Sequence, residues 1–196
     1  MSLLCTLAWL LCVIYSTIPA FWLLIHPRAG FWRSRPASPY KILLPLWIAM
    51  WIIVAAVSYR WRTIAFYQNK WMWIPAAVLF CIGLILYRLS HTGFSLSQLG
   101  GLPELLPNHA HQQLVTTGIR SRIRHPVYLA HLCEMLAWSV GTGLIVCWSL
   151  TAFAIATGAL MIKMEDRELE KRFGEKYRHY RATVPALLPA FNRSKE

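Results

Sequence analysis

The chain has 196 residues, of which 57% are hydrophobic and only 14% are charged, whereas soluble domains have about 45–50% and about 25%. This composition excludes a disordered chain, which needs low hydrophobicity and high charge. It also argues against an ordinary soluble globule, because the charged residues are too few to cover its surface. The net charge of +12 suits either nucleic acid or anionic lipid, so its distribution along the chain has to decide between them.

Three uncharged runs predict membrane-spanning helices in the first half of the chain. Residues 2–25 contain no charged side chain, and a helix of that length crosses a bilayer core of about 30 Å. No Lys or Arg precedes this run, which is also too long for a signal peptide, so we expect it to remain as a span. Residues 42–59 and 71–87 form the second and third runs, with Pro45 and Pro75 near their starts, where a helix tolerates proline.

A fourth apolar stretch, residues 127–162, is too long for one crossing. The Gly-Thr-Gly at 141–143 predicts a break, and therefore a helical hairpin with arms near 127–140 and 144–163. The first arm is too short for a full crossing, so we expect its start at His125 to lie recessed, as the wall of a pocket. The predicted fold class is all-α: a polytopic membrane helical bundle of about five transmembrane helices, including this C-terminal hairpin, with a cytosolic amphipathic C-terminal helix.

The basic residues indicate the orientation of the predicted bundle. Segments 26–41, 88–125 and 163–196 hold four, four and nine Lys and Arg residues, whereas segment 60–70 holds three. The positive-inside rule therefore predicts that the N-terminus lies outside and the C-terminus in the cytosol. The membrane would be the cell (inner) membrane of a bacterium or the endoplasmic reticulum of a eukaryote. We expect contact with membrane lipid and no nucleic acid, because no nucleic-acid motif is present.

Two clusters of polar residues flank the predicted hairpin, which brings them to the same side of the membrane. The first occupies residues 112–128 and the second residues 163–177. His109 and His111 resemble a metal pair, but two loop histidines without a nearby Cys or Asp are usually solvated, and we expect no metal site. Glu134 lies within the first arm, either as a functional group or as a hydrogen-bonded structural one.

The segment that follows the hairpin has a helical pattern. Leu169, Phe173, Tyr177 and Tyr180 recur at spacings of four, four and three, which predicts one helical face. Two interpretations are open. The segment is either an amphipathic helix that lies on the membrane, or a lid over a pocket with Glu165 pointing inward.

Together the two clusters resemble the isoprenylcysteine carboxyl methyltransferase family. The family signature reads LVxxGxYxxxRHPxY, then an apolar hairpin, then EExxLxxxFGxxYxxYxxxVPxxxP. This chain reads LVTTGIRSRIRHPVY at residues 114–128. The second half of the signature corresponds to Glu165-Asp166, Leu169, Phe173-Gly174, Tyr177, Tyr180, Val184-Pro185 and Pro189. The resemblance covers about residues 112–189, and the first hundred residues match only in being membrane spans.

The resemblance implies an all-helical membrane enzyme that binds S-adenosylmethionine in a cytosol-facing pocket beside a lipid tunnel. Residues 1–87 would form three N-terminal transmembrane helices. Residues 88–196 would form the catalytic region, with the hairpin at 126–163. The resemblance places ten residues against the cofactor: Gln112, Gln113, Leu114, Val115, Arg120, His125, Pro126, Val127, Tyr128 and Glu165.

The chain departs from the family pattern at three positions. Arg120 replaces a tyrosine, Asp166 replaces the second glutamate, and Met161 stands where the prenylcysteine enzymes place an arginine for the substrate carboxylate. Lys163, Arg120 or Arg124 can take over that role. The candidate catalytic residues are therefore Glu165, Asp166, Lys163 and Arg124.

The leading functional hypothesis is an integral membrane methyltransferase that acts on a lipid-linked or amphipathic acceptor. Carboxyl O-methylation of a prenylated cysteine is the most similar activity, and a carboxylate is ionised at neutral pH without a general base. The first alternative is a phospholipid or amine N-methyltransferase, which needs a base such as His125 or Asp166. Further alternatives are a non-catalytic membrane protein and a sterol-reductase-like enzyme that uses a nicotinamide cofactor.

Overall fold

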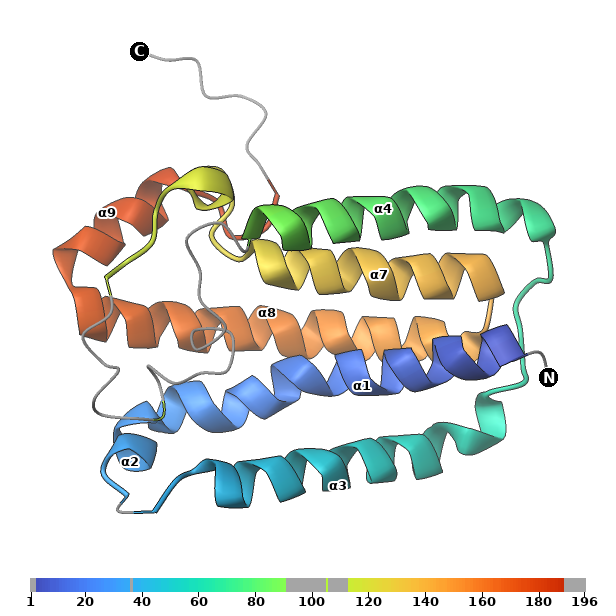
Figure 1. Ribbon diagram of the computed structural model, residues 1–196, viewed down its shortest axis with the longest axis horizontal. Coiled ribbons are helices and arrows are strands. Elements are labelled where there is room, and N and C mark those ends of the chain that lie inside the picture. The colour runs from blue at the N-terminus through green and yellow to red at the C-terminus, as the bar shows by residue number, and fades with distance from the viewer. Residues whose placement is uncertain (1–2, 36, 91–104, 106–112, 189–196) are drawn as a thin grey trace, which may run out of the picture.

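The computed structural model of the chain describes residues 3–35, 37–90, 105 and 113–188. Within these residues the regular elements are helices, so the all-α prediction is confirmed there. The long helices run side by side (Figure 1). They are α1 (Leu3–Ile25), α3 (Tyr40–Ser58), α4 (Trp73–Ser90), α7 (Pro126–Thr142) and α8 (Ile145–Phe173). The short helices are α2 (Ala29–Arg33) and α9 (Glu175–Thr183), and the 3₁₀ turns include η1 (His26–Arg28) and η5 (Gly118–Ser121).

Among the described helices, α1, α3, α4 and α8 are long and apolar enough to cross a membrane. Helix α7 has 17 residues. Its length of about 26 Å is shorter than a bilayer core. The structure therefore supports four spanning helices, and a count of five remains a prediction.

The bundle is built from two tight helix pairs, α4 with α7 and α1 with α8. The core between α1 and α8 includes small side chains on both helices, Ala8 and Cys12 on α1 and Cys147 and Ala154 on α8. Small residues let helix backbones approach closely, which is how membrane helices gain packing energy. Helices α7 and α8 are also joined by a hydrogen bond of 3.0 Å between the hydroxyls of Ser139 and Thr151.

Helix α3 lies at the edge of the bundle and exposes most of its apolar surface. Only Leu43 and Ser58 are buried along its length. Two tryptophans tie α3 to α1: Trp9 Nε1 donates to Ser58 Oγ at 2.9 Å, and Trp47 Nε1 donates to Thr17 Oγ1 at 3.0 Å. A helix that is apolar all round and exposed on one side is typical of a membrane span that faces lipid.

The predicted break in the hairpin is confirmed. Helix α7 ends at Thr142, Gly143 adopts a left-handed conformation with φ of +66°, and α8 begins at Ile145. A side chain at Gly143 would collide with the backbone carbonyl of Tyr67. Glycine is therefore required both by the backbone angle and by the close approach of a neighbouring loop.

The second hairpin arm is longer than predicted. Helix α8 does not end near residue 163 but continues to Phe173, so Glu165 and Asp166 are part of it. Gly174, with φ of +58°, then separates α8 from α9. The prediction of one continuous helical face from Leu169 to Tyr180 is therefore wrong. The four residues of that pattern come instead from two helices, which meet in one apolar cluster.

The two polar clusters lie at the same end of the bundle (Figure 1). At the opposite end, the connection between α3 and α4 pairs with the hairpin turn through Phe66 N to Gly143 O, at 2.9 Å. His109, His111, Gln112 and most of the loop that precedes them lie outside the described residues.

Candidate functional site

The loop before α7 is anchored to α4 and α9 through Arg120. Gly118, with φ of +62°, leads into η5, which presents the arginine. Arg120 Nη1 donates to Ser90 O at 3.1 Å, and the Tyr180 hydroxyl donates to Arg120 O at 2.6 Å. Burial lowers the pKa of the Arg120 guanidinium. The loop is thus held on both sides, with a buried cation at its centre.

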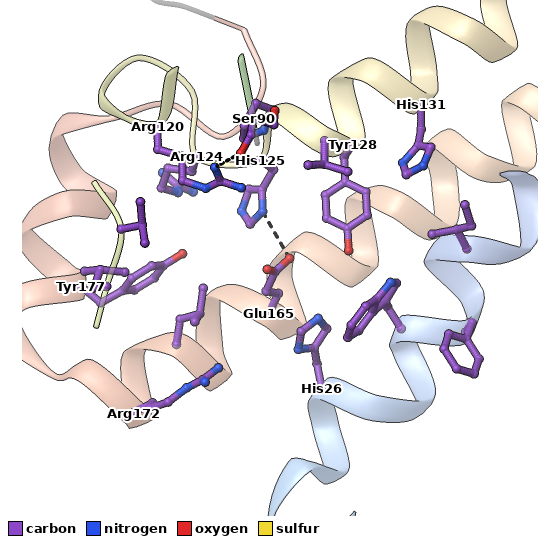
Figure 2. Close-up of a pocket in the computed structure, with 18 of the residues that line it drawn as sticks. His26, Ser90, Arg120, Arg124, His125, Tyr128, His131, Glu165, Arg172 and Tyr177 are labelled. Carbon is purple, nitrogen blue, oxygen red and sulfur yellow. Dashed lines mark hydrogen bonds and ion pairs between the residues drawn. The ribbon is translucent and has the colours of Figure 1, made fainter. Parts of the chain in front are cut away.

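His125 is held between two carboxylates of α8. It stands directly before α7, and Pro126 occupies the first helical position, where no N–H is needed. His125 Nδ1 lies 3.2 Å from Glu165 Oε2 (Figure 2). His125 Nε2 lies 3.3 Å from Asp166 Oδ1. Burial favours the neutral ring, but the two carboxylates outweigh it and raise the pKa of His125 to about 9. The ring is therefore an imidazolium at neutral pH, and both of its nitrogens carry a proton.

Asp166 is a hub that joins three parts of the site. Its carboxylate accepts from Arg124 Nη2 at 2.9 Å, from His125 Nε2 and from the Tyr177 hydroxyl. Burial and the hydrogen bond to Asp166 raise the pKa of Tyr177. Asp166 itself is buried, so it fixes the loop, α8 and α9 relative to one another.

The segment after α9 runs alongside the Arg124-His125 step. The backbone N–H of Arg124 donates to Pro185 O at 2.9 Å, and that of His125 donates to Ala186 O at 3.0 Å. Arg124 Nη1 also donates to the carbonyls of Arg181 and Val184. These bonds add to those from α8 in positioning the start of α7.

A cavity of about 510 Å³ lies beside this network. One wall comes from the loop before α7, from α7 and from α8, and we call it the polar wall. It includes Arg120, Arg124, His125, Tyr128 and Glu165. The opposite wall comes from α1 and α3, and we call it the apolar wall. It includes Ile18, Phe21, Trp22, Leu44 and Trp47. The cavity therefore suits an amphipathic ligand, or a polar ligand next to an apolar one.

The structure brings most of the predicted site residues together. Nine of the ten cofactor candidates line the cavity, and the tenth, Gln112, lies outside the described residues. Among the catalytic candidates, Glu165 and Arg124 line the cavity, whereas Asp166 stands behind His125. Lys163 is exposed and does not line the cavity, so the structure gives it no contact with the site.

Sequence reasoning missed the contribution of the first ninety residues. Those that line the cavity include Trp22 of α1, His26 of η1, Trp47 of α3 and Tyr87 of α4. Sequence reasoning also missed Arg172, which lines the cavity from the last turn of α8. The available signal was a histidine-proline step directly after the first apolar run, similar to the one that precedes α7.

Glu134 has a structural setting away from the His125 network. It is buried on α7, and a Cβ added at Gly83 of α4 would lie 2.9 Å from its Cγ. The absence of a side chain at Gly83 therefore allows α4 to approach α7 over the glutamate. The nearby His131 ring is placed edge-on between Tyr15 and Tyr87, with ring centroids 5.2 Å and 5.3 Å away.

Curated proteins match the sequence over part of its length. Protein-S-isoprenylcysteine O-methyltransferases B and A of Arabidopsis thaliana are each 36% identical to it over 87 residues, or 42% of this chain and 42% of the plant protein. Protein-S-isoprenylcysteine O-methyltransferase of Xenopus laevis is 35% identical over 81 residues, or 39% of this chain and 27% of the frog protein. The resemblance to the isoprenylcysteine carboxyl methyltransferase family is confirmed.

In these matches the chain spans less than half the length of each relative. No family model matches the sequence, and no solved structure matches it. The long apolar helices support the prediction of an integral membrane protein.

Proposed function

We propose that this protein is an S-adenosylmethionine-dependent membrane methyltransferase that methylates the carboxyl group of a lipid-linked acceptor, most simply a prenylated cysteine. One observation carries the proposal: a single cavity between membrane helices joins a charged, hydrogen-bonded wall to an aromatic, apolar wall. The partial matches to protein-S-isoprenylcysteine O-methyltransferases support it.

The residues of the polar wall fit S-adenosylmethionine, which combines an amino acid, an adenosine and a sulfonium centre. Arg120 and the positive end of the α7 helix dipole suit its carboxylate. The ring of Tyr128 suits the sulfonium cation, and the Glu165 carboxylate suits the ammonium or the ribose hydroxyls. When bound, this cofactor supplies a methyl group that an ionised acceptor takes up in a single displacement.

The charge state of the site favours an acceptor that is already ionised. His125 is held as an imidazolium and has no free lone pair, while Asp166 already accepts from three donors. Neither of these two groups is placed to remove a proton. An amine acceptor needs a base, whereas a carboxylate does not, so this arrangement favours O-methylation over N-methylation.

The remaining task of the site residues is to position the reactants and exclude water. His125 orients Glu165 through its Nδ1, and Asp166 holds His125 from the other side. The apolar wall suits an isoprenoid chain, because the aromatic rings of Phe21 and Trp47, stacked 5.0 Å apart, offer it a continuous surface. Arg120, Arg124 and Arg172 add positive charge for an anionic acceptor.

We also propose that the chain crosses the membrane five times, with the start of α7 recessed below the membrane surface. In this arrangement the N-terminus lies outside and the site faces the cytosol. Among the described residues, the end of the bundle that holds the site carries fifteen Lys and Arg residues in segments 26–41, 88–125 and 163–188, and the other end carries three in segment 60–70. This asymmetry supports the orientation.

The experiment is transfer of a radiolabelled methyl group by the purified chain in detergent, together with calorimetric binding of S-adenosylhomocysteine. We expect label in N-acetyl-S-farnesylcysteine as a base-labile ester, and none in phosphatidylethanolamine. His125→Ala and Glu165→Ala should each weaken binding of S-adenosylhomocysteine by about tenfold or more. His179→Ala, on the exposed side of α9, serves as the control. The proposal fails if S-adenosylhomocysteine does not bind, or if only phosphatidylethanolamine is labelled.

A further inference from the structure

His26 is an enclosed histidine whose ring nitrogens have no hydrogen-bond partner in the described part of the chain. It lies in η1 and is 5% exposed, and neither Nδ1 nor Nε2 has a hydrogen-bond partner within the described residues. A neutral imidazole carries one N–H donor and one lone pair, and burying both without partners is unfavourable. Unsatisfied buried polar groups are rare in native proteins, so these two nitrogens point to a ligand that binds at His26.

The ring of His26 is held in a defined orientation. It stacks on Trp22, one turn earlier in the chain, with ring centroids 5.1 Å apart and an interplanar angle of 21°. The 3₁₀ turn η1 separates α1 from α2, and Trp32 Nε1 of α2 donates to Leu24 O at 3.0 Å across that turn. His26 is therefore preorganised by packing, as expected of a ligand-binding side chain rather than a mobile surface residue.

His26 lies where the two walls of the cavity meet. Figure 2 shows Glu165 between His125 on one side and His26 on the other. Phe21 and Trp22 of the apolar wall lie on the last turns of α1, five and four residues before His26. An amphipathic molecule with its apolar chain along this wall would therefore bring its polar head to His26.

We propose that His26 donates a hydrogen bond to the carboxylate of the methyl acceptor. This inference rests on the proposed function, because it assumes a lipid-linked carboxylate as the acceptor. In the reaction an oxygen lone pair of the carboxylate forms the new O–C bond, and the sulfur of the donor keeps the electrons of the broken S–C bond. No proton moves in this step, so His26 binds and orients the acceptor without acting as a base. Met161 of α8 is fully buried and carries no hydrogen-bond donor for this role.

The test compares two ligands that differ only in the carboxyl group. N-acetyl-S-farnesylcysteine carries it, and N-acetyl-S-farnesylcysteamine lacks it. Both are titrated by calorimetry into the full chain in detergent saturated with S-adenosylhomocysteine. His26→Phe keeps a ring for stacking on Trp22 and removes both nitrogens. We expect this variant to bind the acid about tenfold more weakly and the cysteamine within twofold of the original chain.

Two further variants make the result specific. His26→Gln retains an N–H donor and should recover part of the affinity for the acid, whereas His179→Phe on the exposed side of α9 should change neither ligand. Unchanged binding of S-adenosylhomocysteine shows that each variant is folded. Equal weakening of the acid and the cysteamine by His26→Phe, or no weakening of either, overturns the role of His26. Absence of S-adenosylhomocysteine binding by the original chain overturns the proposed function instead.

Discussion

The two walls of the cavity are built in different ways. The polar wall is fixed by interlocking bonds in which Asp166 joins Arg124, His125 and Tyr177. The apolar wall is held by aromatic packing and a few hydrogen bonds, such as the one from Trp47 to Thr17. A network of this kind holds specific groups at defined distances, whereas an apolar surface only has to fill space. The comparison indicates that the polar wall determines the chemistry and the apolar wall determines which acceptor chains fit.

The largest effect is expected at Asp166. Asp166→Asn removes the charge that compensates Arg124 and the His125 imidazolium, both of which are buried or nearly so. We expect a loss of about 3–5 kcal/mol in the free energy of unfolding, measured by thermal unfolding in detergent. Glu170→Gln, one turn later on α8, breaks the more exposed ion pairs with Arg178 and Arg181 and should cost about 1 kcal/mol or less. Equal effects of the two substitutions would remove the distinction between the network and ordinary surface pairs.

The pH dependence of stability tests the charge of His125. Its pKa is raised from 6.5 to about 9 on folding, so its contribution is complete below pH 6.5 and is lost as the pH rises through about 9. We expect the free energy of unfolding to fall by roughly 3 kcal/mol between pH 6 and pH 10. His125→Gln should flatten this part of the profile, as followed by chemical unfolding in mixed micelles. An unchanged profile in His125→Gln would mean that another group titrates.

A smaller effect, confined to the acceptor, is expected from the apolar wall. Trp47→Ala should weaken binding of N-acetyl-S-farnesylcysteine about tenfold, because it removes apolar surface that the chain would cover. The affinity for the shorter geranyl analogue should fall less, and the affinity for S-adenosylhomocysteine should stay the same. All three affinities are measured by calorimetry. Trp71→Ala, an exposed tryptophan in η3 (Lys70–Met72), which precedes α4, is the matched control. Weaker binding of S-adenosylhomocysteine to Trp47→Ala would show that the two walls do not act separately.

Most of the polar wall was predictable because its residues are grouped in two short segments. Residues 114–128 carry the first half of the family signature with the spacing intact, and nine of the ten cofactor candidates line one cavity. The apolar wall was not predictable in the same way. The sequence shows no difference between apolar residues that face lipid, the protein core or the cavity, so Trp22 and Trp47 could not be singled out.

The amino-acid sequence by itself determined which segments are suited to cross the hydrocarbon core of a membrane, because long runs of apolar residues without charges are unfavourable in water. It also determined the hairpin break at Gly143, because the positive φ angle excludes most other residues. Only the tertiary structure decided that α8 continues past Lys163. The end of the apolar run in the sequence marks where the chain leaves the hydrocarbon core. It does not mark the end of the helix, whose backbone hydrogen bonds continue to Phe173. The tertiary structure also decided that Arg124 and His26 line the cavity and that Lys163 does not, because the lining depends on which helix faces meet.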